Sequence, residues 1–203
     1  MALKTLHSQS YSHGDLKPEN VCVRESSGGG LKFSLIDFGL CKKLPVPGNN
    51  RKKNSNFRGN LMFCSDLQLK HFIPTLYCDL TSLVAVAFYV VEKEVPSTIY
   101  ASECMKKNPE IDLFSQKEFK YFRQIYQRRF EKDFCSKMNP FHKLYSYIRN
   151  KRDFEELRER KFLKAKEGGK VFQAAQIDYE HLVTLIPDEY GLKGDLNFTK
   201  PTR

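Results

Sequence analysis

The distribution of apolar and polar positions along the chain predicts several helices. The longest apolar run extends from Leu83 to Val91, within a segment over residues 79–94 that is typical of a buried helix. The run is far shorter than the roughly 20 apolar residues that a membrane span needs. Asp79 is a candidate N-cap, because its carboxylate can accept from the first free amide groups of a helix. Pro96 is expected to end the segment.

Weaker helical patterns occupy much of the remaining chain. Residues 2–10 predict a short helix, and the helical spacing of aromatic residues over 115–134 predicts one buried face. Residues 140–167 predict one or two further helices that become increasingly charged. A last amphipathic element is expected over 177–186, followed by a loose tail over 191–203.

The strand signals are few and lie close together. Two short β-rich pieces, residues 21–23 and 32–37, flank a Ser- and Gly-rich segment over 25–30, which predicts a hairpin. Residues 45–60 are dominated by Pro, Gly, Asn and Lys, which is typical of a long exposed loop. The sequence therefore predicts a mainly α chain with a small β-hairpin.

Composition and charge restrict the class of protein only in part. The 203 residues fit one domain with a tail. A net charge of +10 favours anionic partners such as phosphates, nucleic acid or acidic protein surfaces, without choosing among them. The six Cys are scattered without a CxxC pair, and the N-terminus lacks the apolar core of a signal peptide. We therefore expect free thiols and an intracellular location, in the cytoplasm or nucleus.

The polar stretch HGDLKPEN, residues 13–20, carries the candidate chemistry. Lys17 lies between Asp15 and Asn20, and Asp37 follows the second β-piece inside a DFG tripeptide. Phosphoryl transfer needs a group that orients the attacking hydroxyl, a cation for the γ-phosphate and oxygen ligands for Mg²⁺. Asp15 is the candidate orienting base and Lys17 the candidate cation. Asn20 and Asp37 are the candidate metal ligands, brought together by the hairpin that joins their strands.

The order of these motifs resembles that of a known family. HGDLKPEN followed by IDFGL resembles the catalytic loop and magnesium-binding motif of the eukaryotic protein kinases. Residues 59–97 are similar to the casein kinase and vaccinia-related kinase group. The resemblance, over residues 1–135, implies a protein-kinase-like C-terminal lobe, ATP and Mg²⁺ as cofactors, and a protein substrate. Residues 1–140 would form this large lobe, and 141–203 a helical, charged extension or tail.

The resemblance also implies roles for supporting residues. Asp79 would brace the backbone of the catalytic loop from the start of the buried helix. Gly14 replaces the Arg that gathers a phosphate on the activation segment in many kinases, so we expect no switching by such a phosphate. Asn60 stands where a Thr often supports the base, a hydrogen bond that an amide can replace. Gly39 would let the backbone turn sharply after Asp37, and His13 would pack under the loop and bond backbone groups.

The small N-terminal lobe of a kinase, with its glycine-rich phosphate cover and strand Lys, has no counterpart in this sequence. We therefore expect a fragment of a longer product or a degenerate relative, with an exposed apolar surface where that lobe would pack. The leading hypothesis is a protein serine/threonine kinase that is inactive as this chain alone. One alternative is a pseudokinase-type binding module. A weaker one is a basic, nucleic-acid-associated protein. No membrane partner is expected.

Overall fold

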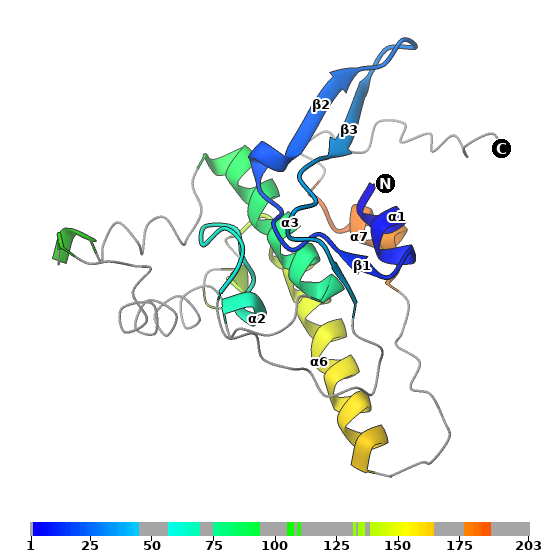
Figure 1. The fold of residues 1–203 in the computed structure, drawn as a ribbon, viewed down its shortest axis with the longest axis vertical. Helices are drawn as coiled ribbons and strands as arrows, with labels where there is room; N and C mark the ends of the chain where they lie inside the picture. Colours follow the sequence, from blue (N-terminus) through cyan, green and yellow to red (C-terminus); the bar gives the residue numbers. More distant parts are fainter. Residues whose placement is uncertain are drawn as a thin grey trace.

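A computed structural model describes most of the predicted elements. It covers residues 2–44, 57–69, 75–93, 105–107, 109–110, 132, 134–136, 139–164 and 177–187. The elements discussed below are α1 (Ala2–Ser8), β1 (Tyr11–Ser12), η1 (Pro18–Asn20), β2 (Val21–Glu25), β3 (Leu31–Leu35), β4 (Lys42–Lys43), α2 (Asp66–Leu69), α3 (Leu76–Glu92), α6 (His142–Lys164) and α7 (Tyr179–Thr184). Figure 1 shows α3 and α6 in the body, α1 beside α7, and the β2–β3 hairpin projecting outward. The predicted tail, nearly all of the predicted helix over 115–134 and most of the 45–60 loop lie outside the described residues.

Helix α3 confirms the predicted buried helix and corrects its start. Its N-cap is Thr75, whose backbone N–H donates to Cys78 Sγ at 3.4 Å. The prediction that Asp79 caps the helix was therefore wrong, because this residue lies inside the first turn with its side chain buried. The helix ends at Lys93, which adopts a left-handed conformation with φ 61°. The predicted stop at Pro96 lies outside the described residues.

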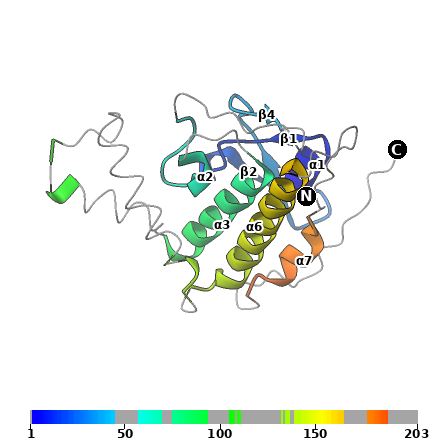
Figure 2. The same ribbon diagram turned by 90° about the horizontal axis from the view of Figure 1, so that it is seen from below.

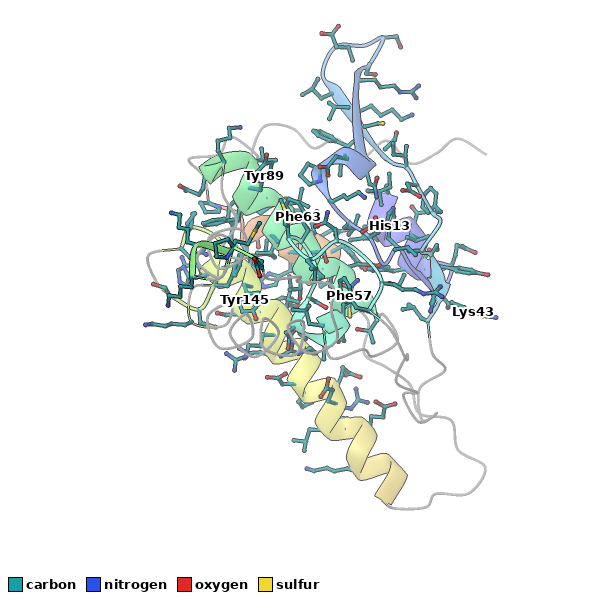
Figure 3. The ribbon with its side chains drawn as sticks, turned by 60° about the vertical axis from the view of Figure 1, so that its left-hand side comes forward. His13, Lys43, Phe57, Phe63, Tyr89 and Tyr145 are labelled. Atoms are coloured by element: carbon teal, nitrogen blue, oxygen red, sulfur yellow. The ribbon has the colours of Figure 1, made fainter. Side chains whose placement is uncertain are left out.

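Helix α6 is one continuous helix that packs along α3, as Figure 2 shows. Its buried face includes Tyr145 and Ile148, which join the same apolar core as the α3 side chains. Phe63 and Tyr89, labelled in Figure 3, meet edge to face in this core with ring centroids 5.6 Å apart. Among the described residues, the core comprises Leu3, Leu16, Phe63, Cys64, Leu69, Tyr77, Leu80, Val84, Ala85, Val86, Phe134, Phe141, Leu144, Tyr145, Ile148, Tyr179 and Leu182. The division of the chain at residue 140 stays a prediction.

A buried ion pair fastens α6 to the short helix α2. Arg152 Nη1 lies 2.9 Å from Asp66 Oδ1, and both side chains are almost fully buried. Burial lowers the pKa of the Arg152 guanidinium, but the charge of Asp66 and the hydrogen bond to Asp153 outweigh it, so the pKa is raised. Arg152 therefore keeps its positive charge, and its contact with Asp66 joins two elements that lie far apart in the sequence.

The hairpin confirms the strand prediction. Strands β2 and β3 pair antiparallel from Val21↔Leu35 to Glu25↔Leu31. The turn needs two residues with positive φ, and Gly29 (φ 78°) and Gly30 (φ 92°) supply them without the steric cost that a side chain would add. A second antiparallel ladder, β1 with β4, was not predicted, because two-residue strands leave no alternation in the sequence.

One face of the hairpin is apolar and open to water. Val23 and Phe33 are paired across the strands and are 51% and 60% exposed, and Leu31 on the same face is 63% exposed. Ile36 and Phe38, which follow β3, are also exposed. Figure 3 shows the hairpin extending away from the body of the molecule. The hairpin therefore carries an exposed apolar face, whereas its use as the packing surface of an N-terminal lobe stays a prediction.

A helix that spans a membrane needs about 20 predominantly apolar residues. No helix within the described ranges is both long and apolar enough to cross a membrane.

Candidate functional site

The backbone of the HGDLKPEN loop is held by a buried carboxylate of α3. Asp79 Oδ2 accepts from the backbone N–H of His13 at 2.7 Å, and Oδ1 accepts from that of Gly14 at 2.9 Å. Hydrogen bonds to an ionised acceptor are about twice as strong as neutral ones. Asp79 therefore fixes the loop at its first residues, which confirms its expected bracing role.

His13 ties the same loop to the DFG segment. Its fully buried ring accepts from the backbone N–H of Asp15 through Nδ1 at 3.4 Å, so Nε2 carries the proton and donates to the Ile36 carbonyl at 3.0 Å. The ring also packs against Phe38, with centroids 5.2 Å apart. Figure 3 labels His13 beside the base of the hairpin. The predicted structural role of His13 is confirmed.

Asp15, Lys17 and Asn20 form one interlocked cluster within the loop. Lys17 Nζ lies 3.0 Å from Asp15 Oδ2. Asn20 Nδ2 donates to the Asp15 backbone carbonyl at 2.9 Å and approaches Asp15 Oδ2 at 3.4 Å. Asp15 Oδ1 is buried and has no hydrogen-bond partner among the described residues. The cluster thus orients the Asp15 carboxylate and leaves one of its oxygens unpaired.

The Lys17 ammonium experiences several negative charges. Its pKa is raised, first by the hydrogen bond to Asp15, against an opposing effect of burial, and then by the charges of Asp15, Glu19 and Asp37. Lys17 therefore stays cationic at neutral pH. Asp15 of the loop and Asp37 of the DFG segment thus both contribute to the raised pKa of Lys17.

The hairpin register sets the position of Asp37. The backbone N–H of Ile36 donates to the Asn20 carbonyl at 3.0 Å, so Asp37 follows directly on a residue bonded to Asn20. Asp37 is exposed and has φ 59°, which places the left-handed residue of the turn at Asp37. The expected turn after Asp37 is confirmed at Gly39 and Leu40, where the Cys41 N–H donates to the Phe38 carbonyl at 2.9 Å. Gly39 also supplies space, since a Cβ there would lie 3.2 Å from Asp37 Oδ1.

The structure explains the glycine at position 14. Gly14 has φ 78°, and a Cβ built on it would lie 2.9 Å from the Leu40 carbonyl oxygen. Such a contact is closer than real Cβ atoms tolerate, and the obstacle is backbone that cannot rotate away. The loop therefore accommodates glycine and excludes the arginine common in related loops.

Gly14→Arg is consequently expected to destabilise the chain by about 2–4 kcal/mol, the sum of left-handed strain and overpacking. Urea unfolding measures the change. Gly28→Arg is the matched control, because a Cβ at Gly28 meets nothing within 4 Å. Equal stability of the two variants would show that the Gly14 site has room for a side chain.

Segment 57–69 supports the loop through residues that the sequence analysis missed. Gln68 Nε2 donates to the Gly14 carbonyl at 2.8 Å, and a Cβ at Gly59 would lie 3.1 Å from the same oxygen. Asn60 Oδ1 accepts from the Met62 backbone N–H at 2.7 Å. Because Asp15 Oδ1 has no partner within the described ranges, Asn60 does not replace the hydrogen bond expected of it. No sequence pattern distinguishes Gln68.

Protein metal sites are usually built from several His, Cys, Asp or Glu side chains that lie close together. Within the part of the chain that the structure describes, no group of three or more His, Cys, Asp or Glu side chains is arranged to hold a metal ion. The predicted ligands, Asn20 and Asp37, are one amide and one carboxylate. A metal bound there would need most of its ligands from another molecule.

Comparison with known proteins places these residues in a family. The chain is 34% identical over 111 residues to the serine/threonine-protein kinase/endoribonuclease IRE1 of Oryza sativa subsp. japonica, covering 54% of the chain and 12% of that protein. It is 52% identical over 42 residues to maternal embryonic leucine zipper kinase of Danio rerio, covering 21% and 6%. A Caenorhabditis elegans protein named as a casein kinase I is 28% identical over 98 residues, covering 47% and 29%.

The chain thus spans less than a third of the length of each of these relatives. The family model described as the protein kinase domain matches residues 1–165. That range contains the loop, the DFG turn and the helix that braces them, and the match over most of the sequence shows that the chain belongs to the protein kinase domain family.

Proposed function

We propose that this chain provides the catalytic-loop part of a protein serine/threonine kinase, which transfers the γ-phosphoryl group of ATP to a protein hydroxyl. Asp15 orients the attacking hydroxyl, and Lys17 neutralises the transferred phosphoryl group. Asn20 and Asp37 provide oxygen ligands for Mg²⁺. Membership of the protein kinase domain family and the serine/threonine kinases among the relatives support this assignment.

The unpaired oxygen of Asp15 is the observation on which the proposal chiefly rests. Asp15 Oδ2 is engaged by Lys17, whereas Asp15 Oδ1 is buried without a donor among the described residues. A buried acceptor without a partner costs free energy that an incoming donor would recover. A substrate hydroxyl is such a donor, and its proton would be held at Oδ1 during the reaction.

The donor set also fits a nucleotide-bound magnesium ion. Mg²⁺ is commonly held by one or two protein groups together with substrate phosphates and water. Asn20 donates its side-chain amide nitrogen to Asp15, so its side-chain oxygen stays available to a metal. The Asp37 carboxylate is exposed. When bound, Mg·ATP supplies the phosphoryl group and neutralises its charge. The residues of this chain hold the phosphate end of such a site.

Within the family, we place the chain near the casein kinase and vaccinia-related kinase group. Two observations support this placement: Gly14 in the middle of the loop motif, where its φ of 78° is required, and the similarity to the protein named as a casein kinase I. The relatives also include other kinase groups, so this placement is narrower than the family assignment.

Binding of Mg·ATP tests the proposal without requiring turnover. At tenfold excess over the dissociation constant, the nucleotide should raise the melting temperature by about 3–6 °C. Asp37→Asn should abolish the rise, because it removes the exposed metal-binding carboxylate. Glu25→Gln is the control, since this exposed carboxylate lies on the hairpin outside the loop. The proposal fails if millimolar Mg·ATP leaves the melting temperature unchanged, or if Asp37→Asn responds like the unaltered chain.

A non-catalytic binding module is the second candidate function. The apolar, exposed hairpin face formed by Val23, Leu31 and Phe33 favours it, because such a face is typical of an interaction surface. The thermal measurement separates the two candidates, since a pure binding module requires no response to Mg·ATP.

A further inference from the structure

A continuous chain of buried hydrogen bonds links helix α7 to the catalytic loop. The Tyr179 hydroxyl bonds His7 Nδ1, and His7 Nε2 lies 2.9 Å from Asp79 Oδ2. The same Asp79 oxygen accepts from the His13 backbone N–H at 2.7 Å, while Oδ1 accepts from Gly14. Tyr179, His7 and Asp79 are 8%, 9% and 1% exposed, so water cannot readily substitute for any member.

The chemistry of the groups sets the direction of these bonds. A carboxylate only accepts, so the His7 proton on Nε2 points to Asp79. In the neutral ring, Nδ1 is then an acceptor and needs a donor. Burial raises the pKa of the Tyr179 hydroxyl, and the negative charge of Asp79 adds to the rise. Tyr179 therefore keeps its proton at neutral pH and donates to His7.

Helix α7 is firmly docked in the position that this bond requires. Asp178 caps the helix by accepting from the backbone N–H of Glu180 at 3.1 Å and of His181 at 2.9 Å. Leu182 is buried in the common core, and the His181 ring meets Tyr147 of α6 at 4.9 Å between centroids. Figures 1 and 2 show α7 against α1 and α6.

Helix α7 lies outside the part of the chain that the protein kinase family model matches. The family model ends at residue 165, whereas α7 begins at Tyr179. The bond from Tyr179 to His7 therefore comes from a helix beyond the matched range. Packing of α7 against the core would need only an apolar side chain at position 179. Tyr179 has in addition a hydroxyl that bonds His7, whose ring in turn bonds the Asp79 carboxylate.

We propose that Tyr179 is a positioning residue, which sets the backbone of the catalytic loop through His7 and Asp79. Without the hydroxyl, the His7 ring loses the bond that fixes its orientation, and Asp79 Oδ2 loses a fixed donor. The grip of Asp79 on the His13 and Gly14 amides then weakens. The catalytic consequence rests on the proposed function, whereas the effect on the loop backbone does not.

Hydrogen exchange of the His13 and Gly14 amides in the full chain tests this directly. Tyr179→Phe keeps the ring but removes the hydroxyl, and it should speed exchange of these two amides about threefold to tenfold, the effect of losing one buried hydrogen bond. Amides in the middle of α3 should keep their rates. Glu180→Gln is the matched control on the same helix, because it removes only the exposed ion pair with Lys4 and should leave the loop amides unchanged.

Two further variants decide whether the effect passes through the proposed route. In a His7→Leu background, Tyr179→Phe should add less than a twofold change, because the link is already broken. Leu182→Ala loosens α7 without touching the link and should speed exchange broadly rather than at the two loop amides. The proposal is overturned if Tyr179→Phe changes all protected amides equally, leaves the loop amides unchanged, or adds its full effect in the His7→Leu background.

A kinetic measurement separates this proposal from the proposed function. This measurement compares the unaltered chain with Tyr179→Phe, both in a form that transfers phosphate. In Tyr179→Phe, kcat should fall and KM for ATP should stay the same, because the variant moves the loop and leaves the nucleotide contacts in place. A rise in KM for ATP with kcat unchanged would contradict the positioning role. Failure of the unaltered chain to bind Mg·ATP would remove the proposed function, while the exchange result would still decide the role of Tyr179.

Discussion

Asp79→Ala is expected to lower the free energy of unfolding by about 3–5 kcal/mol, because a buried charge with several donors leaves each of them unpaired when it is removed. The carboxylate is 1% exposed and accepts from the His13 and Gly14 amides and from His7. Alanine would leave these donors without acceptors and open a cavity beside the loop. Chemical unfolding followed by circular dichroism measures the loss.

Two variants sharpen this test. Asp79→Asn preserves the shape and one acceptor oxygen, so it should cost less than alanine but more than a surface change. Glu92→Ala alters an exposed carboxylate at the other end of the same helix and should stay within about 0.5 kcal/mol of the unaltered chain. A loss below about 1 kcal/mol for Asp79→Ala would mean that the carboxylate does not hold the loop.

Arg152→Met should be similarly destabilising, by about 3–5 kcal/mol, because it removes the buried positive charge that lies against the Asp66 carboxylate. Nη1 of Arg152 lies 2.9 Å from Asp66 Oδ1, and the two side chains are 9% and 3% exposed. The measurement is again the free energy of unfolding, together with the melting temperature. Lys161→Met removes an exposed positive charge from the same helix and serves as the control.

The double variant Arg152→Met with Asp66→Leu distinguishes the cost of an unpaired charge from the worth of the pair. Replacing a buried ion pair by apolar groups is often close to neutral, so the double variant should recover more than half of the loss. Additive losses would indicate instead that each side chain stabilises the chain independently of the other.

The elements with a local signal were predictable from the sequence. The β2–β3 hairpin follows from two β-rich pieces around a glycine-rich turn, and α3 follows from its apolar run. The position of Asp79 shows the limit of this reasoning. A carboxylate near the start of a helix suggests a cap, but Thr75 takes that position, and Asp79 is used for a contact with a loop more than sixty residues earlier.

The candidate site likewise contains residues that the sequence predicted and residues that it did not. Asp15, Lys17 and Asn20 were identified because their spacing within one short loop carries the chemistry. His7, Gln68 and Tyr179 were missed, because each acts through a partner distant in the sequence and none repeats with any period. The turn at Gly39 was predicted, whereas the left-handed conformation of Asp37 was not, because a non-glycine residue adopts it uncommonly and no pattern in the sequence marks it.

The network around Asp79 also has a consequence for the order in which the chain folds. Its donors lie 72, 66 and 65 positions before it, and His7 in turn bonds a tyrosine 172 positions further along. Closing such large loops lowers the chain entropy before the stabilising contacts form. The hairpin loses less entropy, because its strands are separated by only a few residues. During synthesis, the hairpin should therefore be complete early, while the loop over residues 13–20 reaches its final shape only after Tyr179 has left the ribosome.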